Sequence, residues 1–116
     1  CHLGVFPSYY EPWGYTPVEC LVRGIPSITS DLSGFGDYVL KNLRNKNKDG
    51  LYIVERKYNG FDDSAKQLAH QMLEFVKLNR RDRIMQRNNV EQLSTEFDWE
   101  RLLKFYTKAY IQVLKD

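Results

Sequence analysis

The stretch that most constrains the fold of this chain is EPWGYTPVE, residues Glu11–Glu19. It follows a short apolar run, Leu3–Ser8, that predicts a buried strand, and it leads into Val18–Arg23, which predicts the start of a helix. Gly14, in the turn between them, lets the backbone approach a ligand closely. A strand, a glycine-bearing turn and a helix start in this order are typical of an α/β fold that holds an anion at the helix N-terminus.

The start of this helix carries its own signals. Thr16 is suited to the N-cap, and Pro17 is suited to the first helical position because that position needs no amide donor. Glu19 then falls where a capping box places a glutamate, which would turn back onto the N-cap amide. The free amides and the dipole of the helix favour phosphate, so the stretch predicts a site for a nucleotide diphosphate.

The rest of the first half predicts a βαβ unit. The first helix, Pro17–Arg23, ends where Gly24 takes the position after the C-cap and Pro26 follows. The next elements are a strand at Ser27–Ser30, a turn at Asp31–Gly36, a short helix from Asp37 to Lys41, an exposed loop at Asn42–Gly50 and a last strand at Leu51–Val54. Strand, helix and strand at this spacing favour a small parallel sheet.

The second half predicts helices. Ser64 and Gln67 form another capping-box signature, and two long helices are expected within Ser64–Glu96. The first is amphipathic, with apolar residues at helical spacing at Ala65, Leu68, Ala69, Met72, Leu73 and Val76. The second, Arg80–Glu96, has a thin apolar stripe. Asp98 is expected to cap a third helix that ends near Leu114 and has one broad apolar face, made by Trp99, Leu102, Leu103, Tyr106, Tyr110 and Val113.

Size and composition bound the class of protein. With 116 residues, 42% of them hydrophobic and 28% charged, the chain is one globular domain at most. A net charge of +2 is too small to imply a nucleic-acid or membrane partner, and no apolar run approaches the length of a bilayer span. Cys1 and Cys20 lack metal-ligand spacing and are expected to stay reduced. Because the chain begins at Cys1 rather than Met, we expect it to be an excised fragment.

Several of these motifs together resemble a known family. The string CHLGVFPSYYEPWGYTPVE has two glutamates, Glu11 and Glu19, with seven residues between them, and GIPSIT and LSGFG follow it. These residues resemble the glycogen synthases of animals and fungi (glycosyltransferase family 3). NRRDRIMQR, at Asn79–Arg87, resembles a second hallmark of the same family. The resemblance runs from Cys1 to about Leu114 and so covers nearly the whole chain.

The resemblance implies an architecture. The family consists of retaining glycosyltransferases with two Rossmann-like domains, the GT-B fold, and the chain would be the C-terminal portion of such an enzyme. Residues 1–60 would belong to the Rossmann-like domain that binds the nucleotide sugar. Residues 61–116 would be the C-terminal helices, including an arginine-rich regulatory helix. The fragment alone is expected to be inactive, because the acceptor-side domain and the basic residues that neutralise the donor diphosphate lie upstream in this family.

The resemblance also implies roles for the two glutamates and the residues between them. Glu11 would contact hydroxyls of the transferred glucose and stabilise positive charge at its anomeric carbon, without acting as a nucleophile. Glu19 would bind the ribose hydroxyls of the uridine nucleotide, and amides of Gly14, Tyr15 and Thr16 would bind the diphosphate. From the residues alone, Glu19 is equally explained by helix capping and Glu11 by a solvated loop carboxylate. The position of Glu11 after a strand still favours a site, since ligands of open α/β sheets bind there.

A second site is implied on the arginine-rich helix. Arg83 and Arg87 lie one turn apart and share a helix face, and in the family such a pair binds the phosphate of glucose 6-phosphate. His2 would lie near the same activator. Asn89 and Gln92 stand where arginines are usual, which puts the inhibitory control by the rest of the cluster in doubt.

By composition alone, this helix is also compatible with a solvated basic face, or with a polyanion- or nucleic-acid-binding module that uses residues 80–87. RNA-binding surfaces usually interleave aromatic residues with the basic ones, and none occur between Arg80 and Glu96.

The expected partners follow from the resemblance. They are UDP-glucose as donor, glycogen as acceptor, glucose 6-phosphate as activator, glycogenin, and further copies of the full-length chain in a homo-oligomer, a tetramer. Neither a nucleic acid nor a membrane is expected as a partner. No metal and no cofactor are expected, and the expected location is the cytoplasm.

Overall fold

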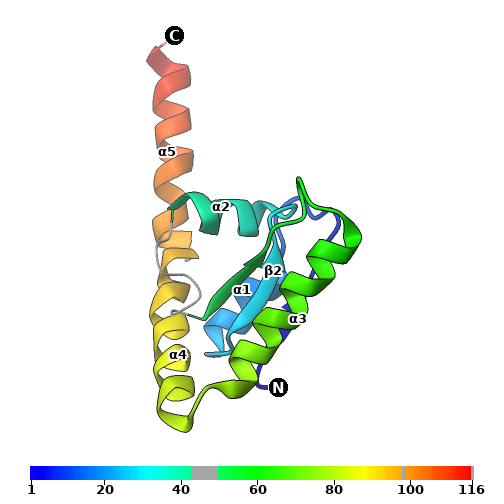
Figure 1. Ribbon diagram of the computed structural model, residues 1–116. Helices are drawn as coiled ribbons and strands as arrows, with labels where there is room; N and C mark the ends of the chain where they lie inside the picture. The colour runs from blue at the N-terminus through cyan, green and yellow to red at the C-terminus, as the bar shows by residue number, and fades with distance from the viewer. Residues whose placement is uncertain (43–49, 98, 116) are drawn as a thin grey trace.

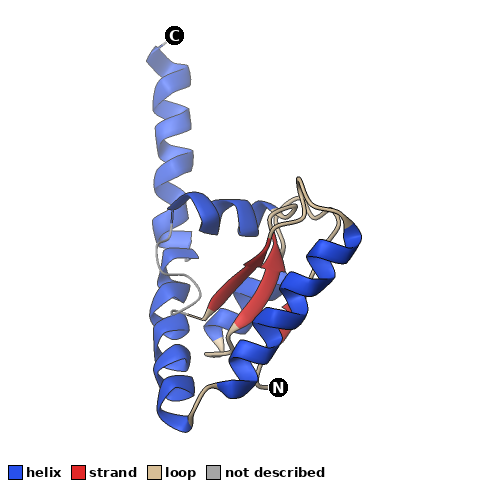
Figure 2. Ribbon diagram, viewed as in Figure 1, coloured by secondary structure: helices blue, strands red, loops and turns tan. Residues whose placement is uncertain are grey.

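The computed structural model describes residues 1–42, 50–97 and 99–115. Its elements are β1 (Gly4–Phe6), α1 (Tyr15–Val22), β2 (Ser27–Ser30), α2 (Gly34–Asn42), β3 (Leu51–Val54), α3 (Phe61–Lys77), α4 (Arg80–Leu93), the 3-10 turn η1 (Ser94–Phe97) and α5 (Trp99–Lys115). The strands form one three-stranded sheet in the order β1-β2-β3, with helices on both faces (Figures 1 and 2). Among the described residues no helix is both long and apolar enough to cross a membrane.

The sheet is parallel throughout, as predicted. Gly4 pairs with Ser27, and Ser27 pairs in turn with Leu51 on the other side. Strands β2 and β3 have the predicted bounds, whereas β1 is shorter than the expected Leu3–Ser8. All residues of β2 and β3 are buried, as expected of parallel strands covered on both faces.

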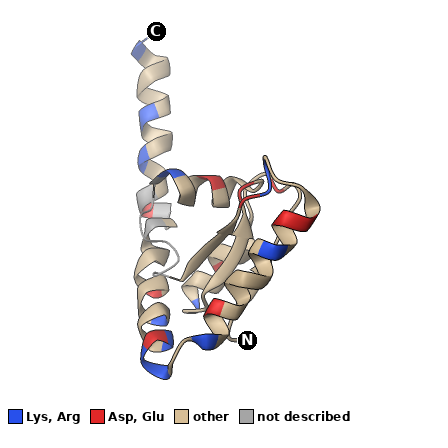
Figure 3. Ribbon diagram, in the orientation of Figure 1, with Lys and Arg blue, Asp and Glu red and all other residues tan. Residues whose placement is uncertain are grey.

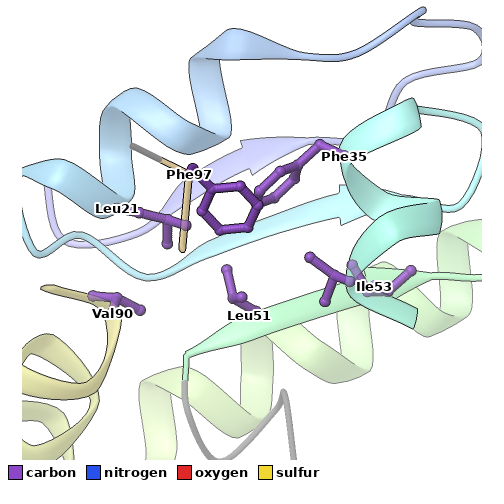
Figure 4. Packing of buried hydrophobic residues seen from close by; sticks show 7 residues of the cluster. Leu21, Phe35, Leu51, Ile53, Val90 and Phe97 are labelled. Carbon is purple, nitrogen blue, oxygen red and sulfur yellow. The ribbon is translucent and has the colours of Figure 1, made fainter. Parts of the chain in front are cut away.

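Alternate residues of β3 point to two hydrophobic clusters. Leu51 and Ile53 belong to the larger cluster, shown in Figure 4, which α1, α2, α4 and η1 complete with Leu21, Phe35, Val39, Val90 and Phe97. Tyr52 and Val54 belong to the smaller cluster, which Leu68 of α3 covers from the opposite face. Helix α3 therefore covers one face of the sheet, and α1, α2, α4 and η1 cover the second.

The two predicted capping boxes are wrong, because both helices begin earlier than expected. The N-cap of α1 is Gly14, without any side-chain cap, so Thr16 lies inside the first turn and Glu19 beyond it. The N-cap of α3 is Gly60, and Ser64 is a buried residue within the helix. Asp62 and Asp63 occupy the first turn of α3, where the helix dipole favours negative charge, and this outweighs the local Ser64 signal.

The predicted end of the first helix is correct. The amide of Gly24 donates to the carbonyl oxygen of Leu21 at 2.9 Å, and that of Ile25 donates to Cys20 at 2.9 Å. This pair of hydrogen bonds, with Gly24 at φ 71°, is a Schellman motif.

Helix α2 was predicted from Asp37, with a turn before it, but it begins at Gly34. The hydroxyl of Ser33 caps it by accepting a hydrogen bond from the amide of Gly36 at 3.0 Å. The predicted loop at 42–50 lies mostly outside the described residues.

The C-terminal part contains the predicted long helices, with one difference in packing. Helix α4 ends at Leu93, and η1 then leads into α5, which extends away from the rest of the chain (Figure 1). The predicted cap Asp98 lies outside the described residues. The apolar face of α5 is largely exposed within this chain, with Tyr106 51%, Tyr110 67% and Val113 73% accessible.

Candidate functional site

The loop that carries Glu11 is fastened to the loop after β2. The amide of Gly34 donates to the carbonyl oxygen of Glu11 at 3.1 Å, and that of Phe35 donates to Trp13 at 2.8 Å. Glu11 and Ser33 also form an isolated parallel bridge, which extends the β1–β2 pairing beyond the strands. The backbone of Glu11 is therefore fixed at the C-terminal edge of the sheet, while its side chain is exposed.

A cavity of about 290 Å³ lies at this edge. Three predicted site residues, Glu11, Gly14 and Thr16, line it, and its other lining residues are Phe6, Pro7, Ser8, Pro17, Thr29 and Ser33. The first turns of two helices, α1 and α2, begin in this wall. Unpaired amides of a helix start, together with its dipole, favour an anion. The first amides of α2, those of Gly34, Phe35 and Gly36, already donate within the chain, so the start of α1 is the one suited to phosphate groups.

Thr29 and Ser33 are site residues that sequence reasoning missed. Their hydroxyl oxygens lie 3.3 Å apart, and the Ser33 hydroxyl also donates to the carbonyl oxygen of Ser30 at 2.9 Å. The Ser30 hydroxyl donates to the carbonyl oxygen of Ser8 at 2.6 Å and so ties the two loops together. Ser33 has Gly36 three residues later instead of Glu or Gln, so no capping-box signature was present to identify it.

Two glycines are required by the geometry of this site. Gly14 has φ 98°, in the left-handed region, and a Cβ atom there would lie 3.4 Å from Cγ of Glu11. At Gly34, a Cβ atom would overlap the carbonyl oxygen of Pro12, so only glycine lets α2 start this close to the loop.

Two other predicted donor residues do not line the cavity. The side chain of Tyr15 is 72% exposed and lines a separate cavity of about 530 Å³ with Trp13 and residues of α5. Glu19 is exposed and lies further along α1, outside the lining residues. Burial raises the pKa of the neighbouring Cys20 thiol above its usual value, the charge of Glu19 adds to the rise, and Arg23 opposes it. The structure thus brings Glu11 to the cavity and leaves Glu19 outside its wall.

The predicted sugar-phosphate residues come together at the opposite edge of the sheet. His2, Arg83 and Arg87 line one cavity of about 130 Å³, together with Cys1, Gly24, Ile25, Pro26 and Phe75. His2 precedes β1, while the arginines come from α4, so residues far apart in the sequence meet there. Basic residues gather at the start of α4, at the lower end of the view in Figure 3.

Arg83 is held in place by the helix before it. Its Nη2 donates to the carbonyl oxygen of Val76 at 2.9 Å, and its guanidinium lies 5.2 Å from the ring centre of Phe75. Its Nε is buried and has no hydrogen-bond partner among the described residues. Arg87 is exposed. A donor held in this way at a cavity is suited to an anionic oxygen.

The start of α4 sets the direction of these side chains. The side chain of Asn79 caps the helix by accepting the amide of Asp82 at 2.8 Å. Asp82 and Asn89 line a different cavity, of about 520 Å³. There the Gln86 amide donates to the buried hydroxyl of Tyr52 at 2.7 Å. Burial raises the pKa of Tyr52 above its ordinary 10.0, the hydrogen bond from Gln86 opposes this rise, and Glu74 adds to it.

The cysteines and acidic residues show no further grouping. Cys1 and Cys20 are free thiols. Within the described ranges, no three side chains of His, Cys, Asp or Glu lie together in a way that would hold a metal ion.

Comparisons with known proteins give a consistent result. The family model described as glycogen synthase matches residues 1–116. The chain is 56% identical over 108 residues to a glycogen [starch] synthase of Neurospora crassa, covering 93% of this chain and 15% of that protein. It is 53% identical over 109 residues to the liver glycogen [starch] synthase of Mus musculus, covering 94% of this chain and 16% of that protein. It is 57% identical over 111 residues to glycogen [starch] synthase isoform 2 of Saccharomyces cerevisiae, covering 94% of this chain and 16% of that protein. The chain thus spans about 15–16% of the length of these relatives.

Proposed function

The chain belongs to the glycogen synthase family, and from that premise we propose that the protein containing it transfers glucose from UDP-glucose to the non-reducing end of an α-1,4-glucan. The anomeric configuration would be retained. The observation that carries this proposal is the cavity at the C-terminal edge of the sheet, where Glu11 meets the starts of two helices. A sugar diphosphate needs both features, an anion site and a carboxylate beside the sugar.

In the donor site, the amides in the first turn of α1 bind the diphosphate. Gly14, Tyr15 and Thr16 are the residues of this turn, and only their backbone is needed, so the outward side chain of Tyr15 is compatible with the role. The start of α2 adds a second dipole directed at the same cavity. Glu19 lies along α1 beyond the cavity, and we assign it to the ribose hydroxyls of a nucleoside that extends in that direction.

Glu11 acts on the sugar. As the bond from the anomeric carbon to the diphosphate breaks, positive charge develops on the ring, and a nearby carboxylate stabilises it. A hydroxyl of the acceptor then bonds to the anomeric carbon on the same face, its proton passes to a phosphate oxygen, and UDP leaves. No covalent bond to Glu11 is required.

The cavity lined by His2, Arg83 and Arg87 is our proposed site for glucose 6-phosphate. Two guanidiniums one helical turn apart converge on one phosphate, and each charge-assisted hydrogen bond contributes about 1.5–3 kcal/mol. The buried Nε of Arg83 supports a bound anion, because it has no other partner in the described part of the chain. The same geometry disfavours a nucleic-acid-binding module, since Arg83 is packed against Phe75.

Several wider features belong to the same proposal. We infer the GT-B architecture, a homo-oligomer that is a tetramer, glycogenin as a partner and a cytoplasmic location, all from the family to which the chain belongs. The two free thiols are compatible with a reducing compartment.

A direct assay tests the proposal. The full-length protein is mixed with UDP-glucose carrying labelled glucose, and incorporation of the label into glycogen is measured. Glu11→Gln should lower kcat by about 100-fold or more while UDP affinity changes little, because the carboxylate acts mainly in the transition state. Absence of transfer by the wild-type protein, or near-normal turnover by Glu11→Gln, would contradict the proposal.

A further inference from the structure

A group of exposed aromatic rings lies beside the candidate donor cavity and has no role in the function proposed so far. Tyr9 and Tyr10 are each 78% exposed, Tyr58 is 89% exposed and Phe61 is 78% exposed. They belong to the loop after β1, the loop after β3 and the first residue of α3, which all lie at the C-terminal edge of the sheet (Figure 1). We call Tyr9, Tyr58 and Phe61 the aromatic rim.

The loops that carry this rim are held together by specific contacts. The Arg56 guanidinium donates to the carbonyl oxygen of Pro7 at 2.7 Å and lies 5.3 Å from the ring centre of Tyr9. The carboxylate of Asp31 accepts hydrogen bonds from the amides of Arg56 at 2.8 Å and Lys57 at 3.1 Å. The loops after all three strands are therefore joined, and the rings stand on a preorganised surface.

A cavity of about 140 Å³ adjoins the rim at Phe61. Its wall includes Pro7, Arg56, Phe61 and Ser64. Ser64 is 5% exposed, and its buried hydroxyl has no hydrogen-bond partner among the described residues. An unpaired buried hydroxyl is costly, and a polar ligand group would satisfy it. Pro7 also lines the donor cavity, so the two cavities adjoin at this residue.

We propose that the aromatic rim and the adjoining cavity form a subsite for the α-1,4-glucan acceptor, holding sugar units behind the one that reacts. The inference rests on the proposed transferase function, because the acceptor must enter the donor cavity from an adjoining surface. A glucose ring offers an apolar C–H face and a periphery of hydroxyls. Exposed aromatic rings suit that face, and the Ser64 hydroxyl suits the periphery.

The charges around the rim favour this neutral ligand over a nucleic acid. Exposed aromatic rings next to basic residues also stack nucleic-acid bases. Asp62 and Asp63, however, lie in the first turn of α3, directly after Phe61, and would repel phosphates. The Arg56 guanidinium is already bonded to Pro7, and the Lys57 ammonium lies 5.5 Å from the ring centre of Tyr58. A hydroxyl-rich polymer without charge therefore fits the rim better.

The test uses the full-length enzyme with paired substitutions. Tyr58→Ala and Phe61→Ala remove a ring, whereas Tyr58→Phe and Phe61→Tyr keep one and serve as matched controls. Loss of a stacked ring should raise KM for glycogen and for maltohexaose by about 3- to 10-fold at each position, with KM for UDP-glucose unchanged. The controls should stay near the wild-type values. Because both side chains are exposed, the unfolding temperature should not change.

Affinity electrophoresis in gels containing glycogen provides a measurement that does not depend on turnover. The Ala variants should be retarded less than the wild type, whereas the ring-keeping controls should be retarded as much as the wild type. This result is expected even if no transfer were detected. Failure of the wild-type protein to transfer glucose, with ring-dependent glycogen binding, would contradict the proposed function alone. If the Ala variants kept the wild-type KM for glycogen and the wild-type retardation, the proposed subsite would be overturned. The subsite would also be overturned if the Ala variants lost binding to single-stranded RNA in a gel-shift assay while their glycogen binding stayed unchanged.

Discussion

The rings of Trp13 and Phe97 lie with their centres 6.4 Å apart and their planes inclined by 59°. Trp13 belongs to the loop that carries Glu11, and Phe97 belongs to the 3-10 turn that follows the arginine-bearing helix α4. Phe97 also contacts Phe35 and Tyr38, at 5.1 and 5.7 Å between ring centres. The candidate donor loop and the end of α4 thus share one aromatic cluster, so a displacement of α4 acts directly on the neighbourhood of Glu11.

Removing Phe97 tests this shared cluster. Phe97 is 8% exposed, so Phe97→Ala should lower the free energy of unfolding by about 3–5 kcal/mol, and the loosened loop should raise KM for UDP-glucose. A double-mutant cycle with Trp13→Ala should give a coupling energy of about 0.5–1.5 kcal/mol in calorimetric unfolding of the enzyme. Strictly additive effects of the two substitutions would show that the rings do not act together.

Gly14→Ala should impair donor binding. Alanine at φ 98° costs about 1–3 kcal/mol, and its Cβ would contact Cγ of Glu11 at 3.4 Å. We expect a lower unfolding temperature and a higher KM for UDP-glucose. Gly60→Ala is the matched control, because Gly60 has φ −72° and an added Cβ meets nothing within 4 Å. Equal kinetic effects at both glycines would contradict the role given to Gly14.

Replacing Arg83 and Arg87, which line the candidate glucose 6-phosphate cavity, should separate activation from catalysis. The double variant Arg83→Ala, Arg87→Ala should lose activation by glucose 6-phosphate and keep measurable basal transfer, because neither residue lies in the donor cavity. The variant Arg80→Ala, Arg81→Ala removes the same charge from the same helix, outside that cavity, and should keep activation. Activation that survives loss of Arg83 and Arg87 would leave the helix as a solvated basic face.

Alkaline pH should weaken the fold through Tyr52. Burial raises its pKa above 10.0 in the folded protein, so the neutral phenol is favoured there. This contribution to stability is fully present below pH 10.0 and is lost as the pH rises through the folded-state pKa. Tyr52→Phe should cost about 1 kcal/mol at neutral pH, where it removes the acceptor of the Gln86 hydrogen bond. Between about pH 8 and 10.5 its stability should then fall less than that of the wild type; an equal fall would contradict the assignment.

The buried strands were predicted well from the sequence, whereas the first residues of the helices were predicted less well. Strands Ser27–Ser30 and Leu51–Val54 were found with correct bounds because their residues are uniformly buried. The first helix was placed too late, because Thr16 satisfies a local capping rule while hydrogen bonds from the α2 start to Glu11 and Trp13 fix the loop before it. Such contacts come from a distant part of the chain, and local signals do not contain them.

The candidate sites were predicted unevenly for the same reason. The spacing of Arg83 and Arg87 on a helix could be found in the sequence, and the family resemblance added His2. The contribution of Thr29 and Ser33 to the donor cavity depends on the closure of the β1 and β2 loops, which only the folded chain shows. The rim was missed because exposed tyrosines carry no periodic pattern.

Strand β1 separates the two candidate anion sites, with His2 before it and Glu11 after it. It is three residues long, about 10 Å, and its pairing with Ser27, Ile28 and Thr29 allows neither stretching nor slippage without losing the ladder. The strand is therefore expected to keep the two candidate anion sites at a constant spacing. An effect of one site on the other would then require the whole sheet to tilt with its attached helices, rather than a change in the length of β1.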